Sequence, residues 1–186
     1  MRVFAAIRPP EAALEHLQAG LAPLRDGTGD RLRWLPLEQL HLTVAFYGEV
    51  PDGAASDLQS TLAAGVAGSG ALQLSLRGAG TFSSRNLWIG VAGQVAALRQ
   101  LMADCAHIPL TATGEQRAPR PHLTVARVGR RARELDVRPL ARALAVYSGP
   151  EWTADRVQLV SSRLGEGPGG SVAHEVIGAV DLERVI

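Results

Sequence analysis

Apolar residues recur at helical spacing in three stretches of the chain. Within each stretch they lie three or four residues apart, so they share one face of a helix. The sets are Leu14, Leu17 and Leu21; Leu58, Leu62 and Val66; and Val95, Leu98, Leu101, Met102 and Cys105. We therefore expect one helix from Pro10 to near Gly20 and Pro23, a second over 54–66, and a third from 95 onward with Cys105 in its apolar stripe.

Apolar runs bounded by turn residues predict strands elsewhere in the chain. These runs cover residues 2–7, 31–35, 41–47, 72–76, 87–91, 122–128, 157–160 and 172–180. Residues 111–121 contain glycine and prolines and predict a loop, and a short helix is expected near 140–146. The order of strand, helix, strand and helix, followed by further strands, favours an α+β fold with mostly antiparallel pairing.

Composition predicts a single domain over residues 1–186. Apolar residues make up 46% of the 186 positions and charged residues 20%, which is typical of a globular chain that folds by packing. No apolar run approaches the roughly 20 residues of a membrane span, and the N-terminus lacks the pattern of a signal peptide. We therefore expect a cytoplasmic, monomeric protein without a membrane segment or an internal disulfide.

The positive charges are all arginines and are unevenly distributed. The chain has 19 basic residues and a net charge of +1. Residues 117–142 hold eight of these arginines against only Glu134 and Asp136. This excess has two interpretations, a solvated charged loop or a phosphate-binding surface, for which the bidentate guanidinium is suited.

The most informative feature is a repeat of five residues. His41-Leu42-Thr43-Val44-Ala45 recurs without change over 122–126. Side chains on a strand alternate between faces, so the histidine and the threonine of each copy point to the same side. Two such strands related by a pseudo-twofold axis would direct two imidazoles and two hydroxyls into one cleft.

That set of groups suits phosphodiester cleavage. One imidazole can take a proton from water while the other gives a proton to the leaving oxygen. The threonine hydroxyls can donate to the non-bridging phosphate oxygens. The alternatives are histidines that only pack on their strands and a zinc site, but zinc needs three or four ligands and no close-spaced set exists. We therefore expect no metal and no cofactor.

The other histidines have structural interpretations. His16 lies off the apolar stripe of its predicted helix and is expected to face solvent. His107 follows the third helix and is expected to interact with its C-terminus. His174 shares an alternating strand with Val172 and Val176, which favours a partly buried structural role.

Together these residues resemble the 2H phosphoesterase superfamily, and specifically the bacterial and archaeal RNA 2′,3′-cyclic phosphodiesterases, also called 2′-5′ RNA ligases. The resemblance covers nearly the whole chain. Beyond the paired motifs it rests on residues 2–10, 34–40, 80–82, 87–88, 120–127, and Ser162, Leu164 and Gly165. The chain departs from it at Val160, where an aromatic residue is common, and in a short turn between Phe82 and Trp88.

The resemblance implies a two-lobed fold with pseudo-twofold symmetry. Each lobe would be an antiparallel sheet with outer helices, and the active cleft would lie between the lobes. One lobe would hold both chain ends and the other roughly residues 47–115. The implied activity is metal-independent hydrolysis of 2′,3′-cyclic phosphate ends of RNA or nucleotides to 2′-phosphomonoesters.

The resemblance also implies the site residues. His41, Thr43, His122 and Thr124 form the catalytic quartet, with His41 as the acid and His122 as the base. Phe46 and Arg127 contact the base or the phosphate of the substrate, which requires a twist or bulge after Ala45 and Ala126 because strict alternation would point them away. Two alternatives remain: a 2′-5′ phosphodiester ligase or cleaving enzyme, and a non-catalytic nucleotide- or RNA-binding module.

Overall fold

The structure is a computed structural model that describes residues 1–51, 53–106, 120–129, 132, 135–167 and 171–183. The helices are α1 (Glu11–Thr28), α2 (Ala55–Val66), α3 (Val95–Ala106) and α4 (Arg138–Ala143), with short 3-10 turns η1 (Gly29–Arg31) and η2 (Leu37–Gln39). The strands are β1 (Arg2–Ile7), β2 (Leu32–Trp34), β3 (Leu42–Glu49), β4 (Leu72–Phe82), β5 (Asn86–Gly93), β6 (His122–Val128), β7 (Ser148–Ala154), β8 (Arg156–Gly167) and β9 (Ser171–Asp181).

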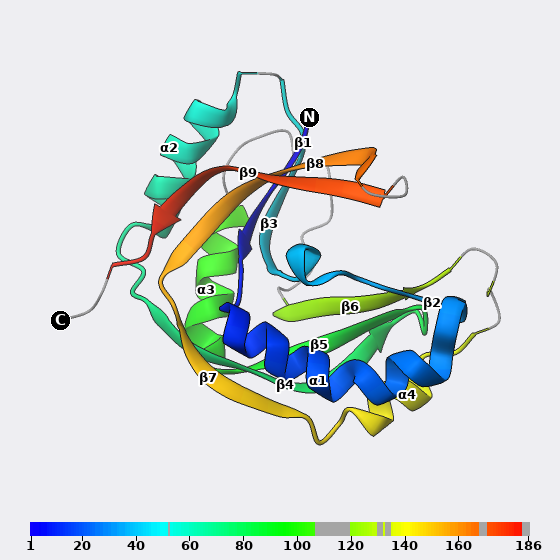
Figure 1. Ribbon diagram of the computed structural model, residues 1–186. Helices are drawn as coiled ribbons and strands as arrows, with labels where there is room; N and C mark the ends of the chain where they lie inside the picture. Colours follow the sequence, from blue (N-terminus) through cyan, green and yellow to red (C-terminus); the bar gives the residue numbers. More distant parts are fainter. Residues whose placement is uncertain (52, 107–119, 130–131, 133–134, 168–170, 184–186) are drawn as a thin grey trace.

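Within the described residues all nine strands belong to one sheet, whose named ladders are antiparallel. The order is β7-β4-β5-β6-β3-β1-β8-β9, and β2 pairs with β6. Figure 1 shows that the sheet is strongly curled, as in a half-barrel. The α+β class and the antiparallel pairing predicted from the sequence are therefore confirmed.

The two motif strands lie at the middle of this sheet. β3 and β6 are joined by a single residue pair, Leu42 opposite Leu123. On either side of this junction lie four strands of the main order. The two-lobed, pseudo-twofold arrangement implied by the resemblance stays an interpretation of this topology.

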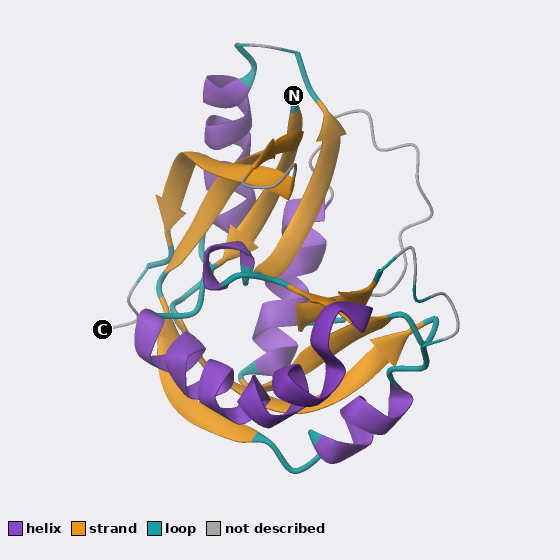
Figure 2. Cartoon of the chain, turned by 45° about the vertical axis from the view of Figure 1, so that its right-hand side comes forward, coloured by secondary structure: helices purple, strands orange, loops and turns teal. Residues whose placement is uncertain are grey.

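Helices cover one face of the sheet and build the main core. Helix α3 packs on β3, α2 on β9, α1 on β7 and α4 on β4, and Figure 2 shows α1 running across the lower strands. The alternation of β1 explains a second, smaller cluster: Val3, Ala5 and Ile7 join the main core, whereas Phe4 and Ala6 pack with Val160 on the opposite face. That opposite face carries the candidate site.

Several boundaries differ from the prediction. Helix α1 continues through Gly20 and Pro23 to Thr28. Its buried face runs from Leu14 through Leu21 to Thr28, so packing outweighs the local signals to stop. Strand β7 was not predicted, and β4 and β8 are longer than predicted. No helix among the described residues combines the length and the apolar character needed to cross a membrane.

Candidate active site

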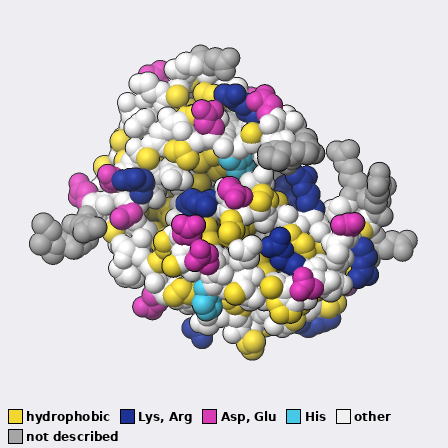
Figure 3. Space-filling model, viewed as in Figure 1, with side chains coloured by type: hydrophobic (Ala, Val, Ile, Leu, Met, Phe, Trp, Pro, Cys, Tyr) yellow, Lys and Arg dark blue, Asp and Glu magenta, His cyan; other side chains and the backbone are white. Residues whose placement is uncertain are grey.

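The two motifs meet in one cleft. Its free volume is about 120 Å³, roughly ten times the 10–15 Å³ that one water needs. The lining residues are Arg33, Leu35, Gln39, His41, Thr43, His122, Thr124, Arg127, Val172 and His174. The structure therefore brings the predicted quartet and Arg127 together. In the space-filling view a histidine lies in a recess on this face, with arginine side chains nearby (Figure 3).

A bulge occurs at the same point in both motif strands. In β3, Ala45 pairs with Ala5 of β1 and Thr43 pairs with the next residue, so Val44 has no partner in β1. In β6, Ala126 pairs with Leu87 of β5 and Thr124 pairs with the next residue, so Val125 has no partner in β5. An extra residue in a strand reverses the alternation beyond it.

The bulge explains the placement of the two motif-plus-five residues. The valine and the alanine of each motif are both buried, and the next residues, Phe46 and Arg127, are exposed. The sequence predicts a bulge after Ala45 and Ala126. In β6 the register shift lies before Ala126, at Val125, whereas β3 has one shift before Ala45, at Val44, and a second after it, at Tyr47. Arg127 lines the cleft, whereas Phe46 does not and leaves 58% of its surface exposed.

Each motif histidine is oriented by a backbone carbonyl two residues earlier. Nδ1 of His41 lies 2.7 Å from the carbonyl oxygen of Gln39, and Nδ1 of His122 lies 2.6 Å from that of Arg120. A carbonyl oxygen can only accept, so Nδ1 must carry the donated proton in both rings. The Nε2 atom of each ring is then the one that can take or give a proton in catalysis.

Aromatic side chains from β1, β4 and β5 contact both rings. Phe4 stacks on His41 with ring centroids 4.8 Å apart. Phe82 meets His122 edge to face at 4.8 Å, and Trp88 lies 6.1 Å from the same ring. Together with the hydrogen bonds at Nδ1, these contacts restrict rotation of the imidazoles.

Burial makes His41 a weak base in the ligand-free cleft. Its pKa is lowered to about 4, mainly by desolvation, and also by the nearby charges of His174, Arg127 and Arg8, against the opposing effect of the hydrogen bond to Gln39. The pKa of His174 is also lowered, by burial and then by Arg127. Near neutral pH both rings are therefore neutral when the cleft is empty.

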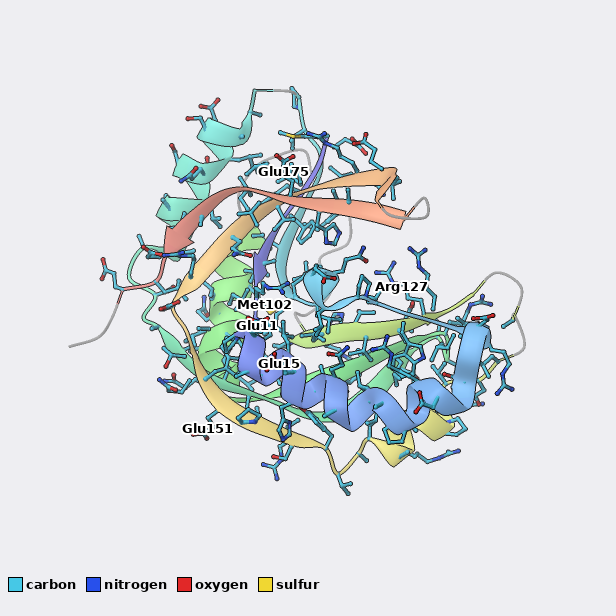
Figure 4. The ribbon with its side chains drawn as sticks, viewed as in Figure 1. Glu11, Glu15, Met102, Arg127, Glu151 and Glu175 are labelled. Carbon is cyan, nitrogen blue, oxygen red and sulfur yellow. The ribbon has the colours of Figure 1, made fainter. Side chains whose placement is uncertain are left out.

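Two arginines form one side of the cleft, here called the arginine pair. Arg33 of β2 and Arg127 of β6 are directly opposite each other in the strand ladder, and Figure 4 shows Arg127 on the side of β6 that faces the β8–β9 hairpin. Among the described residues neither has a carboxylate within 4.0 Å. Two neighbouring cations without an acidic partner favour an anionic ligand.

Only part of the arginine excess over 117–142 lies within the described residues. Arg117, Arg130, Arg131 and Arg133 lie outside the described residues. Arg138 is paired with Asp136 at 2.8 Å and is not among the residues of the cleft. Among the arginines of this segment that the structure describes, Arg127 is the one that lines the cleft.

Sequence reasoning missed several residues of the cleft. His174 is half-buried, as expected from its alternating strand, and it also lines the cleft, which the sequence did not indicate. Gln39 and Arg33 were missed because neither belongs to the repeated motif. His16 bonds the hydroxyl of Tyr147 at 3.0 Å on the surface, and His107 lies outside the described residues.

The sequence model that describes the 2′-5′ RNA ligase superfamily matches residues 7–166. A protein named RNA 2′,3′-cyclic phosphodiesterase from Geobacillus stearothermophilus is 35% identical over 127 residues, which cover 63% of this chain and 40% of that protein. The protein of the same name from Aeropyrum pernix is 34% identical over 118 residues, 58% of this chain and 65% of the relative. The matches thus span less than two thirds of both relatives.

A third protein of that name, from Methanothermobacter thermautotrophicus, is 27% identical over 172 residues, with 89% of this chain and 90% of the relative covered. Among solved structures, Escherichia coli LigT in its apo form matches with a TM-score of 0.71 at 23% identity over 98% of both chains. TT0787 of Thermus thermophilus matches with 0.66 at 22% identity over all of both chains. At these identities the two structures show a shared fold.

Proposed function

Because the chain belongs to the 2′-5′ RNA ligase superfamily, we propose that it is an RNA 2′,3′-cyclic phosphodiesterase that opens terminal cyclic phosphates to 2′-phosphomonoesters. The observation that carries the proposal is the pair of motif histidines with their Nδ1 protons fixed by carbonyls, together in one cleft with a threonine each. The substrates proposed are RNA or nucleotides that end in a 2′,3′-cyclic phosphate.

The reaction needs one proton to be removed from the attacking water and one to be given to the departing 3′ oxygen. A neutral histidine accepts a proton from water, whose oxygen bonds to phosphorus. The bond from phosphorus to the 3′ oxygen breaks, and a protonated histidine supplies the proton that this oxygen takes. Thr43 and Thr124 donate to the non-bridging oxygens while their charge rises.

We assign His122 as the base and His41 as the acid. Because the pKa of His41 is about 4 in the ligand-free cleft, this ring is unprotonated near neutral pH and cannot act as an acid before the substrate binds. A bound phosphate anion offsets Arg127 and Arg8, the cations that disfavour protonation of this ring, and so raises its pKa. In this scheme His41 takes up its proton together with the substrate.

The remaining site residues act on substrate position. Arg127 lines the cleft and can contact phosphate or base, and Phe46 presents an exposed ring on the neighbouring strand that a base can stack against. We further propose that the chain is one domain whose two sheet halves form two lobes around the cleft. Chemistry without a metal or a cofactor stays part of this proposal.

The test is hydrolysis of an oligonucleotide with a 2′,3′-cyclic phosphate end by the purified, chelator-treated protein. The expected product carries a 2′-phosphate, which chromatography against 2′- and 3′-phosphate standards identifies. Turnover that appears only after divalent metal is added, or a 3′-phosphate product, would contradict the proposal. Nucleotide binding with no turnover at all would instead favour the binding module.

A further inference from the structure

A third imidazole lies beside the first motif histidine. The ring of His174, on β9, meets the ring of His41 edge to face with centroids 5.5 Å apart. The same ring lies 5.3 Å from Phe4, the side chain that stacks on His41. His174 is half-buried and lines the same cleft as the quartet.

The ring nitrogens of His174 have no hydrogen-bond partner among the described residues. The three other histidines in the described part of the chain each have one: Tyr147 for His16, Gln39 for His41 and Arg120 for His122. Neither nitrogen is among the buried unpaired side-chain atoms of the described residues, which are Trp88 Nε1, Trp152 Nε1 and Ser161 Oγ. Both nitrogens are therefore accessible to a ligand in the cleft.

A backbone contact fixes where β9 lies relative to the motif. The side-chain amide of Gln39 donates to the carbonyl of Val172 at 2.9 Å. The carbonyl of Gln39 itself accepts from Nδ1 of His41. Gln39 thus binds both the motif histidine and the strand that carries His174, which is two positions beyond Val172. The two imidazoles are therefore held close together by defined hydrogen bonds.

The charge of the cleft favours an anion at this position. The arginine pair lies in the same lining, and none of the lining residues within the described part of the chain is acidic. A neutral imidazole can donate one N–H to a phosphate oxygen without the cost of burying a further charge.

We propose that His174 is a third phosphate-binding imidazole, which donates from a ring nitrogen to an oxygen of the phosphate held by the two His–Thr pairs. This rests on the proposed function insofar as that function places a phosphate in the cleft. It adds a substrate contact from a strand outside the repeated motif.

The test measures binding of inorganic phosphate, which needs no turnover. His174→Phe keeps a ring against Phe4 and His41 but removes both nitrogens, and we expect its phosphate dissociation constant to rise about tenfold in calorimetry, the loss of one hydrogen bond to an anion. His174→Gln keeps an N–H donor and should recover part of this loss. His16→Phe, which removes a surface histidine, should bind as the wild type does.

Ring resonances of the wild-type protein provide a second measurement, independent of how the variants fold. The His174 signals should move during a phosphate titration, and those of His16 should not. Unmoved His174 signals, or phosphate binding by folded His174→Phe within twofold of wild type, would overturn the inference alone. A wild-type protein that binds no phosphate would overturn the inference and the proposed function together, whereas phosphate binding that depends on His174 without hydrolysis would leave this inference standing.

Discussion

Leu42 and Leu123 face each other across the single residue pair that joins β3 to β6. Each directly follows a motif histidine, and each is almost fully buried. The buried pair therefore joins two segments that are distant in the sequence, directly beside the two motif histidines. The catalytic arrangement proposed above depends on this junction.

Loss of either motif imidazole should remove catalysis without unfolding the protein. His122→Asn and His41→Asn are each expected to lower kcat/KM for a cyclic-phosphate dinucleotide by about 10²–10⁴-fold, the usual contribution of a positioned acid or base. His16→Asn serves as the matched control and should keep full activity. Equal rates for His122→Asn and the control would show that His122 takes no part in proton transfer.

The threonines should contribute through their hydroxyl groups. Thr43→Val and Thr124→Val preserve the branched shape but remove the donor, and we expect kcat to fall about 10²–10³-fold for each, as when one transition-state donor is removed. Single-turnover kinetics separate this effect from substrate binding. A change confined to KM would mean that the hydroxyls hold the substrate equally well before and during the reaction.

The partly buried His41 should make folding sensitive to acid. Its folded pKa of about 4 lies below the unfolded value of about 6.5, so the unfolded chain binds more protons between these values. The stability that the neutral ring contributes is complete above pH 6.5 and is lost as the pH falls toward 4. Between pH 7 and 4.5 the free energy of unfolding should fall by about 2–3 kcal/mol more in wild type than in His41→Phe, which urea titrations can measure. Equal pH dependence of the two proteins would show that desolvation does not lower the pKa of His41.

Removing the charge of Arg127 should change both binding and titration. Arg127 disfavours protonation of His41 and of His174, so Arg127→Gln should raise the pKa of both rings as followed by NMR. The same variant should weaken phosphate binding about tenfold, since a hydrogen bond to an anion is lost. Arg138→Gln, at an arginine already paired with Asp136, is the control and should change neither. Rings that titrate as in wild type would place Arg127 too far away to act on them.

Gly80 should be intolerant of any side chain. A Cβ there would meet the Trp88 indole at 2.2 Å, and Trp88 packs beside His122. Gly80→Ala should therefore destabilise the fold by about 1–3 kcal/mol and lower activity by displacing the His122 ring. Gly27→Ala, with nothing within 4 Å and in helix α1, should be neutral or stabilising by up to about 1 kcal/mol. Thermal unfolding of the two variants would decide, and a Gly80→Ala protein as stable as wild type would show that the indole moves aside.

The repeated motif alone was enough to predict which side chains share a face. Alternation along a strand is a local property, so the pairing of His41 with Thr43 and of His122 with Thr124 could be read without knowing the fold. Phe46 and Arg127 are harder to place from the sequence, because the bulged valines depend on the neighbouring strands β1 and β5. The sequence does not predict the register shifts at these valines, before Ala45 and Ala126.

The sequence by itself therefore determined the strand and helix periodicity, the α+β class and the two His–Thr pairs, because these follow from contacts between residues close along the chain. Only the tertiary structure decided that Leu42 meets Leu123, that β9 carries His174 to His41, and that Gln39 bonds Val172 from 133 positions away. Such contacts are set by the curling of the sheet and by packing against helices, and no local pattern encodes which distant strand lies across a cleft. The physical reason is that periodicity fixes the direction of a side chain, whereas its partner depends on the whole chain.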